Sequence, residues 1–351
     1  MFIKARVGIN KTKIFIICGA ISLWSCQESV RPEDTSLVFE RPPHFPEPTY
    51  TFDNNPITQD GFDLGKKLFF DPLLSRDNSV SCNSCHQQAR AFADSPLHPT
   101  SIGIENKFGI RNAPALGNLA FMDEFFWDGG VTHLDFVPIN AIESDVEMGE
   151  TLENVVAKLN DHKEYPHLFK KAFGVDEITS PYMLHALSQF TVMMVSASSR
   201  YDKYVLREGT LNEEELKGLA LFEVKCSGCH SGELFTDFSY RNNGLNTSFE
   251  DKGRALISES NADLGKFRVP TLRNVELTAP YMHNARFETL EEVLDHYGGG
   301  MVDSPTLDPL FKDGQQVVGI PLTQIEKQQI IAFIRTLTDE AFISDPKFMN
   351  Q

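Results

Sequence analysis

Two short segments of the 351-residue chain carry the same arrangement of cysteine and histidine. The residues are Cys82, Cys85 and His86 in the first segment, CNSCH, and Cys226, Cys229 and His230 in the second, CSGCH. Paired cysteines at this spacing can bind zinc, but most zinc knuckles give no role to a histidine directly after the second cysteine. In c-type haem attachment both thiols form thioethers with the haem, and the adjacent histidine binds the iron. The two segments therefore predict two covalent haem c groups, with His86 and His230 as iron ligands.

The N-terminus has the pattern of an export signal. Four cations precede an apolar run, IFIICGAISLW (residues 14–24), that is too short to span a bilayer. The run ends in LWSC, so residues 1–25 are interpreted as a lipoprotein-type signal peptide with Cys26 as the lipid-bearing residue. The alternative is plain cleavage, which gives a soluble exported protein. Either way the protein is expected in the periplasm, held to a membrane only by lipid, and its remaining cysteines all belong to the two haem segments.

The formal net charge is −17, and loss of the leader cations makes it more negative. This sign disfavours nucleic acid as a partner. An acidic surface keeps a protein soluble, and it can also steer a basic partner such as a small electron-carrier protein.

The chain beyond the signal divides into a polar stretch and a body that repeats itself. Residues 26–56 are rich in Pro, Glu, Asp and Thr and are interpreted as a tether. GKKLFFD precedes the first haem segment and GLALFE the second, while AFAD and LFTD follow the two histidines. Duplication is the simplest account, and it predicts one domain over residues 57–206 and another over 207–343.

Helix signals are frequent and strand signals are nearly absent, so the fold class is mainly α. Ser180 is expected to cap a helix with proline in its first turn. Capping residues followed by Glu three positions later stand at Asn212, Thr289 and Thr323. The last of these precedes an apolar face typical of a buried helix, made of Ile330, Phe333, Ile334 and Leu337.

From GKKLFFD onward the chain resembles the bacterial di-haem cytochrome c peroxidases and their MauG-like relatives. The matching stretches are FGIRNAPALGNLAF (108–121), FFWDGG (125–130), DVEMGE (145–150), CSGCH and FRVPTLRNVELTAPYMHNARFETLEEVLDHY (267–297). The resemblance implies two class-I cytochrome c-like domains whose haem groups face each other across the domain interface. It also implies reduction of hydrogen peroxide at the N-terminal haem, with electrons from a small cytochrome c or cupredoxin, and a homodimer.

The resemblance assigns roles to individual residues. Trp127 matches the tryptophan between the haems, although a buried core aromatic would have the same sequence signal. Glu147 matches the distal acid/base, where a carboxylate can move a proton between peroxide oxygens; an exposed glutamate near a helix start is the plain alternative. Asn112, with the backbone oxygens of Thr278 and Pro280, matches an interdomain calcium site, and oxygen ligands suit Ca²⁺.

At the N-terminal haem the sequence departs from the family pattern. The peroxidases carry a histidine in S-I-G-H that blocks the resting iron, and here the segment reads SIGI, ending at Ile104. Isoleucine cannot bind iron, so this site is expected to be open without reductive activation. His98 is the nearest substitute, and a solvent-exposed loop histidine is the plain alternative.

At the C-terminal haem the peroxidases place a methionine where this chain has Tyr297, as in the MauG-like branch. Tyr297 shares a helical spacing with Leu290 and Leu294, so it is expected to point inward, and His296 and Met301 are rival ligands. An anionic oxygen ligand stabilises ferric iron, so this haem would have a low potential.

Three functions remain open: a cytochrome c peroxidase, a MauG-like oxidase that uses peroxide to oxidise a partner protein, and a non-catalytic electron carrier. Tyr297 and Ile104 favour the second. The general run of the family favours the first.

Overall fold

The computed structural model describes residues 1–2, 37–94, 98–312 and 318–350, and residues Thr35–Gln351 form one compact unit. The predicted signal peptide and Cys26 lie outside the described residues. The α-helices are α1 (Gln59–Phe70), α2 (Cys82–Cys85), α3 (Val137–Glu143), α4 (Leu152–Asp161), α5 (Tyr165–Phe173), α6 (Ser180–Val192), α7 (Arg200–Val205), α8 (Glu213–Lys225), α9 (Ala255–Ser258), α10 (Leu290–Asp295), α11 (Gln324–Arg335) and α12 (Glu340–Ile343). In the described part the only strands are β1 (Tyr240–Arg241) and β2 (Phe267–Arg268), which pair antiparallel. The prediction of a mainly α fold is confirmed.

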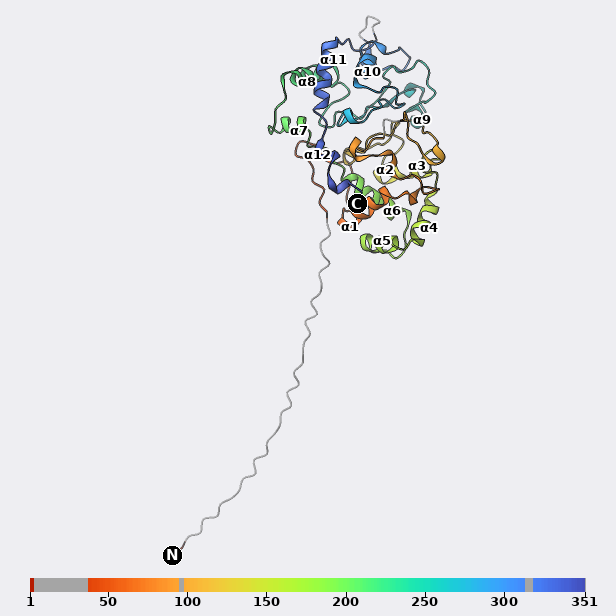
Figure 1. Cartoon of the computed structure of the whole chain (residues 1–351), viewed down its shortest axis with the longest axis vertical. Coiled ribbons are helices and arrows are strands. Elements are labelled where there is room, and N and C mark those ends of the chain that lie inside the picture. Colours follow the sequence, from red (N-terminus) through yellow and green to blue (C-terminus); the bar gives the residue numbers. More distant parts are fainter. Residues whose placement is uncertain (3–36, 95–97, 313–317, 351) are drawn as a thin grey trace. The chain divides into compact units, whose positions relative to one another are not determined.

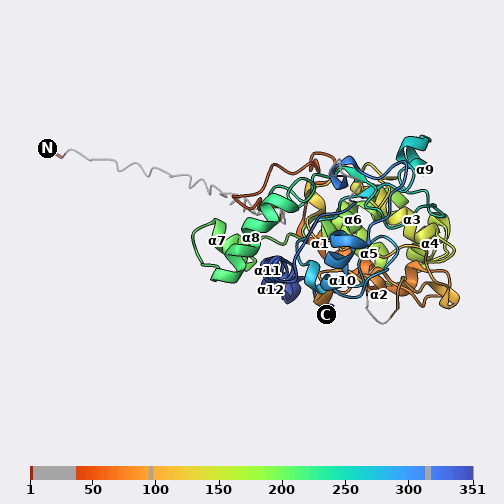
Figure 2. The ribbon, with the colours of Figure 1, turned by 90° about the horizontal axis from the view of Figure 1, so that it is seen from above.

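The N-terminal group of helices is built around a close contact between α1 and α6 (Figures 1 and 2). A Cβ on Gly65 would lie only 1.8 Å from the carbonyl oxygen of Ala186. Only glycine allows the two backbones to approach so closely. The aromatic rings of Phe69 and Phe190 then pack with centroids 5.1 Å apart in the core.

The C-terminal group repeats this contact between α8 and α11, which lie side by side in Figure 1. A Cβ on Gly218 would lie 1.9 Å from the carbonyl oxygen of Gln329. Phe222 and Phe333 pack with centroids 5.1 Å apart, as Phe69 and Phe190 do in the first group. GKKLFF and GLALFE, recognised in the sequence as a repeat, therefore occupy equivalent places.

Most of the predicted helix starts are confirmed. Asn212, Thr289 and Thr323 each accept a hydrogen bond from the backbone N–H of the glutamate three residues later, and each glutamate returns the bond. The start of α6 differs by one residue, because Thr179 rather than Ser180 is the N-cap residue. The predicted apolar face is buried: Ile330, Phe333 and Ile334 of α11, and Leu337 just after the helix.

Two segments pack differently from what the sequence suggested. In the expected tether, Phe45 and Tyr50 are 3% and 6% exposed and belong to the N-terminal core, so residues 37–56 are part of the body. At the other end of the chain, Phe342 and Phe348 also join that core. The C-terminal residues therefore return to the N-terminal group, and Phe342 packs in the N-terminal core although it falls within the range predicted for the second domain, 207–343. Among the helices of the described ranges, none is both long enough and apolar enough to cross a membrane.

Candidate functional site: two cysteine–histidine centres

The first centre follows directly from α2, whose two ends are Cys82 and Cys85. The next residue, His86, donates from Nδ1 to the carbonyl oxygen of Phe92 at 2.9 Å. Burial lowers the pKa of His86, so the ring is neutral. With Nδ1 carrying the proton, Nε2 is free to bind a metal, which is the arrangement that metal-binding histidines usually show.

The second centre repeats this geometry at the end of α8. His230 donates from Nδ1 to the carbonyl oxygen of Phe235 at 3.1 Å, and burial lowers its pKa. Both phenylalanines have left-handed backbone angles, with φ of 61° at Phe92 and 53° at Phe235. Sequence reasoning did not single them out, although the repeated AFAD and LFTD segments that contain them were visible. The left-handed turn aims each carbonyl at the histidine ring.

The four cysteines of the two centres are free thiols. Burial raises the pKa of Cys82 and Cys226 to about 12. Structural zinc usually takes four Cys or His ligands that converge on one site. Within the described ranges no three His, Cys, Asp or Glu side chains converge in a way that could hold a metal ion. The residues fit thioether attachment better than zinc binding.

A cavity of about 650 Å³ opens beside the second centre. Its walls include Cys226, Cys229, His230, Trp127, Arg268 and Tyr297. Most of the other lining residues are apolar, among them Leu290 and Leu294 of α10. Such a space, with a histidine nitrogen and two thiols at its edge, fits a large flat cofactor attached by those residues.

Tyr297 faces this cavity, as its spacing from Leu290 and Leu294 predicted. Burial raises the pKa of its phenol to about 12, although the side chain of Asn243, which hydrogen-bonds the phenol, opposes this shift. The two rival ligands, His296 and Met301, do not line the cavity. His296 places Nε2 2.9 Å from the carbonyl oxygen of Asn243, and Met301 packs with Leu307 and Phe311. Of the three residues proposed as ligands, Tyr297 is therefore the one that lines the cavity, whose wall also includes Met282 and His283.

Glu147 lies next to the first centre. Burial raises the pKa of its carboxyl, opposed by a hydrogen bond with Ser144, and its charge contributes to raising the pKa of the Cys85 thiol. The carbonyl oxygen of Glu147 accepts a hydrogen bond of 2.8 Å from the backbone N–H of Ile104, which is fully buried. The residue at the blocking position is thus packed against the backbone of the predicted acid/base.

His98 is not free in solvent. Its Nδ1 lies 2.8 Å from the carbonyl oxygen of Thr100 and 3.9 Å from a carboxylate oxygen of Asp94. The ring is thus held by its own loop.

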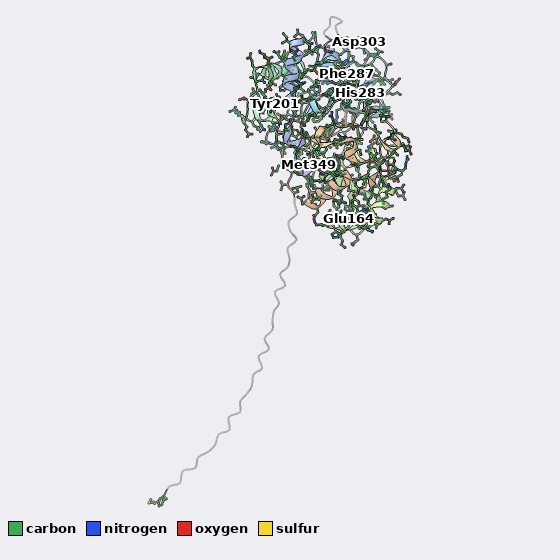
Figure 3. The ribbon with its side chains drawn as sticks, in the orientation of Figure 1. Glu164, Tyr201, His283, Phe287, Asp303 and Met349 are labelled. Carbon is green, nitrogen blue, oxygen red and sulfur yellow. The ribbon has the colours of Figure 1, made fainter. Side chains whose placement is uncertain are left out.

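Trp127 is half-buried and lines the cavity of the second centre. Its Nε1–H donates to the carbonyl oxygen of Asn112 at 2.8 Å, and its own carbonyl accepts from the backbone N–H of Arg268 at 2.8 Å. His283, labelled in Figure 3, meets the Trp127 ring edge-on with centroids 6.5 Å apart. These contacts fix the plane of the indole.

The expected calcium ligands are partly brought together. The amide nitrogen of Asn112 lies 2.5 Å from the carbonyl oxygen of Pro280, and the Asn112 backbone N–H donates to the carbonyl of His283. The side chain of Thr278 bonds the carbonyl of Val275 instead, so only the backbone oxygen of Thr278 is available as a ligand. Backbone oxygens suit a hard cation, but the Asn112 amide presents its nitrogen and not its oxygen to the Pro280 carbonyl.

Comparison with known proteins identifies the family of the chain. The model of the di-haem cytochrome c peroxidase family matches residues 59–210. The chain is 35% identical to the cytochrome c551 peroxidase of Nitrosomonas europaea over 294 residues, which cover 81% of this chain and 82% of that protein. It is 33% identical to the methylamine utilization protein MauG of Methylorubrum extorquens over 308 residues, 86% of this chain and 84% of that protein.

A solved structure supports the same family relationship. The crystal structure of a MauG-like protein associated with microbial copper homeostasis is similar with a TM-score of 0.81 at 31% identity, over 90% of this chain and 99% of that one. The chain therefore belongs to the di-haem cytochrome c peroxidase family, which includes relatives named as peroxidases and as MauG.

Proposed function

We propose that the chain is a di-haem cytochrome c peroxidase that reduces hydrogen peroxide to water. It would carry two haem c groups, one bound through Cys82, Cys85 and His86 and the other through Cys226, Cys229 and His230. Two cytochrome c-like domains, based on residues 57–206 and 207–343, would present these groups to each other across their interface, with residues 37–56 and the C-terminal residues packed on the first domain. The haem groups supply the peroxide-binding iron and the path for electrons.

The observation that carries this proposal is the raised pKa of the Glu147 carboxyl. A carboxyl whose pKa is raised by burial holds its proton to a higher pH than an ordinary glutamate and can return it, which is the property of a general acid/base. Its position beside Cys85 supports action at the first centre. Conversion of one peroxide to two waters consumes two protons and two electrons, and Glu147 would deliver a proton to the leaving oxygen.

Trp127 would relay electrons between the two centres. Support comes from its place on the wall of the second cavity and from the hydrogen bond that fixes its indole on Asn112. A Ca²⁺ ion held by Asn112, Thr278 and Pro280 would stiffen the same loop. Since the chain is acidic, a basic small cytochrome c or a cupredoxin is a suitable electron donor.

A MauG-like oxidation of a partner protein is the second candidate, because Tyr297 faces the second cavity and Ile104 replaces the blocking histidine. A non-catalytic electron carrier is less well supported, since it needs no half-buried carboxyl beside the first centre. We further propose that the protein is exported to the periplasm, anchored there by lipid on Cys26, and active as a homodimer.

The holoprotein should be mixed with hydrogen peroxide and reduced cytochrome c, with Glu147→Gln as the matched variant. Rapid oxidation of the cytochrome by the native chain and slow oxidation by the variant support the peroxidase. A long-lived oxidised state with slow turnover would favour the MauG-like function, and no spectral response would leave only the carrier.

A further inference from the structure

Tyr240, in β1, lies against the loop that carries Trp127. Its hydroxyl donates to Oε2 of Glu124 at 2.7 Å. A Cβ on Gly129 would lie 1.8 Å from that hydroxyl oxygen, so the phenol touches the backbone two residues after Trp127. Gly129 has a φ of 72°, and both this angle and the missing side chain allow the contact.

A second connection joins Tyr240 to Trp127. Tyr240 pairs with Arg268 across the two-stranded sheet, and the backbone N–H of Arg268 donates to the carbonyl oxygen of Trp127 at 2.8 Å. The phenol is therefore connected to the proposed electron relay in two ways, by its contact with the Gly129 backbone and by the bonds that run through Arg268.

The surroundings of Tyr240 provide a proton acceptor. Burial raises the pKa of the phenol and the Glu124 carboxylate raises it further, so the phenol is neutral in the resting protein. Glu124 is held in place by Arg254, at 3.1 Å from Oε1, and by Arg268, which bonds the Glu124 carbonyl. The guanidinium of Arg254 also lies 4.2 Å from the centroid of the Tyr240 ring. Because loss of an electron makes a phenol strongly acidic, a fixed carboxylate at hydrogen-bond distance can accept its proton at once.

We propose that Tyr240 is a reversible one-electron oxidation site coupled to Trp127, an inference that rests on the proposed peroxidase function. Hydrogen peroxide is the oxidant, and its reduction to two waters takes two electrons and two protons. When no donor protein is present, Tyr240 gives one electron by way of Trp127 and the bound cofactor gives the other. The O–H bond of Tyr240 breaks and its proton passes to Glu124. The two protons that enter water come from solvent, one of them by way of Glu147. Two electrons from a donor protein then complete the cycle: one restores the cofactor, and the other, with the proton on Glu124, restores the phenol.

The test is electron paramagnetic resonance of the oxidised holoprotein, frozen after mixing with hydrogen peroxide without a donor. Peroxide consumption is measured in the same samples. A spin trap followed by peptide mass spectrometry locates the radical. The variants are Tyr240→Phe, which removes only the hydroxyl, and Glu124→Gln, which keeps Tyr240 but removes the proton acceptor. Tyr165→Phe is the matched control. The hydroxyl of Tyr165, which lies in α5, also donates a hydrogen bond to a carboxylate, that of Asp71, at 2.6 Å.

The expected result is a tyrosyl signal and a trap adduct on Tyr240 in the native chain and in Tyr165→Phe. Both should be lost in Tyr240→Phe, and the signal should be weaker in Glu124→Gln. If peroxide is consumed but the radical is absent or unchanged in Tyr240→Phe, the inference is overturned and the peroxidase function stands. If the oxidised protein consumes no peroxide, the inference is overturned. If the protein also fails to consume peroxide in the presence of reduced cytochrome c, the proposed function fails as well.

Discussion

The backbone N–H of Ile104 donates to the carbonyl oxygen of Glu147 at 2.8 Å, which joins the position of the missing histidine to the predicted acid/base. The two segments are in tight contact: a Cβ on Gly103 would lie 2.1 Å from the carbonyl oxygen of Val146. A Cβ on Gly149 would likewise lie 2.2 Å from Cδ1 of Ile104. The loop that carries Glu147 and the segment that carries Ile104 therefore pack tightly against each other. A substitution at Ile104 should change the position of Glu147.

Glu147→Gln should lower peroxide turnover by about 10²–10⁴-fold, the usual loss when a general acid/base is removed. The amide has nearly the same shape but cannot carry a proton between oxygens. Steady-state oxidation of a reduced cytochrome measures the effect, and the absorption spectrum of the resting protein should be unchanged. Turnover within a few-fold of the native value would remove Glu147 from the mechanism.

The same substitution should change stability in a pH-dependent way. Burial raises the pKa of Glu147 above its ordinary value of 4.5, so the folded chain retains a proton that the unfolded chain has released. Stability contributed by this residue therefore falls as pH rises from about the ordinary value through the raised one. Glu147→Gln should be more stable than the native chain at neutral pH and nearly equal to it in acid, as measured by denaturant unfolding. A stability difference independent of pH would contradict the burial argument.

Ile104→Ala should destabilise the protein by about 2–5 kcal/mol, because it leaves a cavity at a fully buried position. Ile104→Val is the matched control and should cost about 0.5–1.5 kcal/mol. Since Ile104 packs on the Glu147 loop, the alanine variant should also lose turnover, which can be measured below its unfolding transition. Equal stability of the two variants would show that Ile104 is not packed as described.

Tyr297→Met should raise the reduction potential of the C-terminal haem, because a thioether favours ferrous iron more than a phenolate does. In the unligated chain burial raises the pKa of Tyr297 to about 12, so binding to iron must displace the phenolic proton. A spectroelectrochemical titration measures the potential. Met301→Leu, which preserves volume in the cluster with Leu307 and Phe311, should leave the potential unchanged. If the potential shifted in Met301→Leu but not in Tyr297→Met, Met301 and not Tyr297 would be the iron ligand.

Gly218→Ala should destabilise the protein by at least about 1–3 kcal/mol, since its Cβ would lie 1.9 Å from the backbone of α11 and force α8 away. Gly117→Ala is the control, because the added Cβ would meet only the Phe342 ring at 3.7 Å or more. Thermal unfolding of both variants tests the contact. A neutral Gly218→Ala would show that the two helices are less closely packed.

The sequence was most informative where chemistry is local. The two cysteine–histidine segments, the caps at Asn212, Thr289 and Thr323, and the inward position of Tyr297 follow from spacing along a few residues. The carbonyl groups of Phe92 and Phe235 that bond His86 and His230 depend on left-handed backbone angles. The residue types at these positions do not indicate such angles. The burial of Phe45, Tyr50, Phe342 and Phe348 depends on contacts between segments far apart in the chain, so composition alone suggested a tether and a terminus.

The most direct test is rapid mixing of the fully oxidised holoprotein with hydrogen peroxide, without any reductant, followed by absorption spectroscopy. Because Ile104 cannot bind iron and is packed against Glu147, the N-terminal centre should respond immediately and peroxide should be consumed. An oxidised protein that stays silent until it is reduced, with two histidines on the N-terminal iron, would contradict the account.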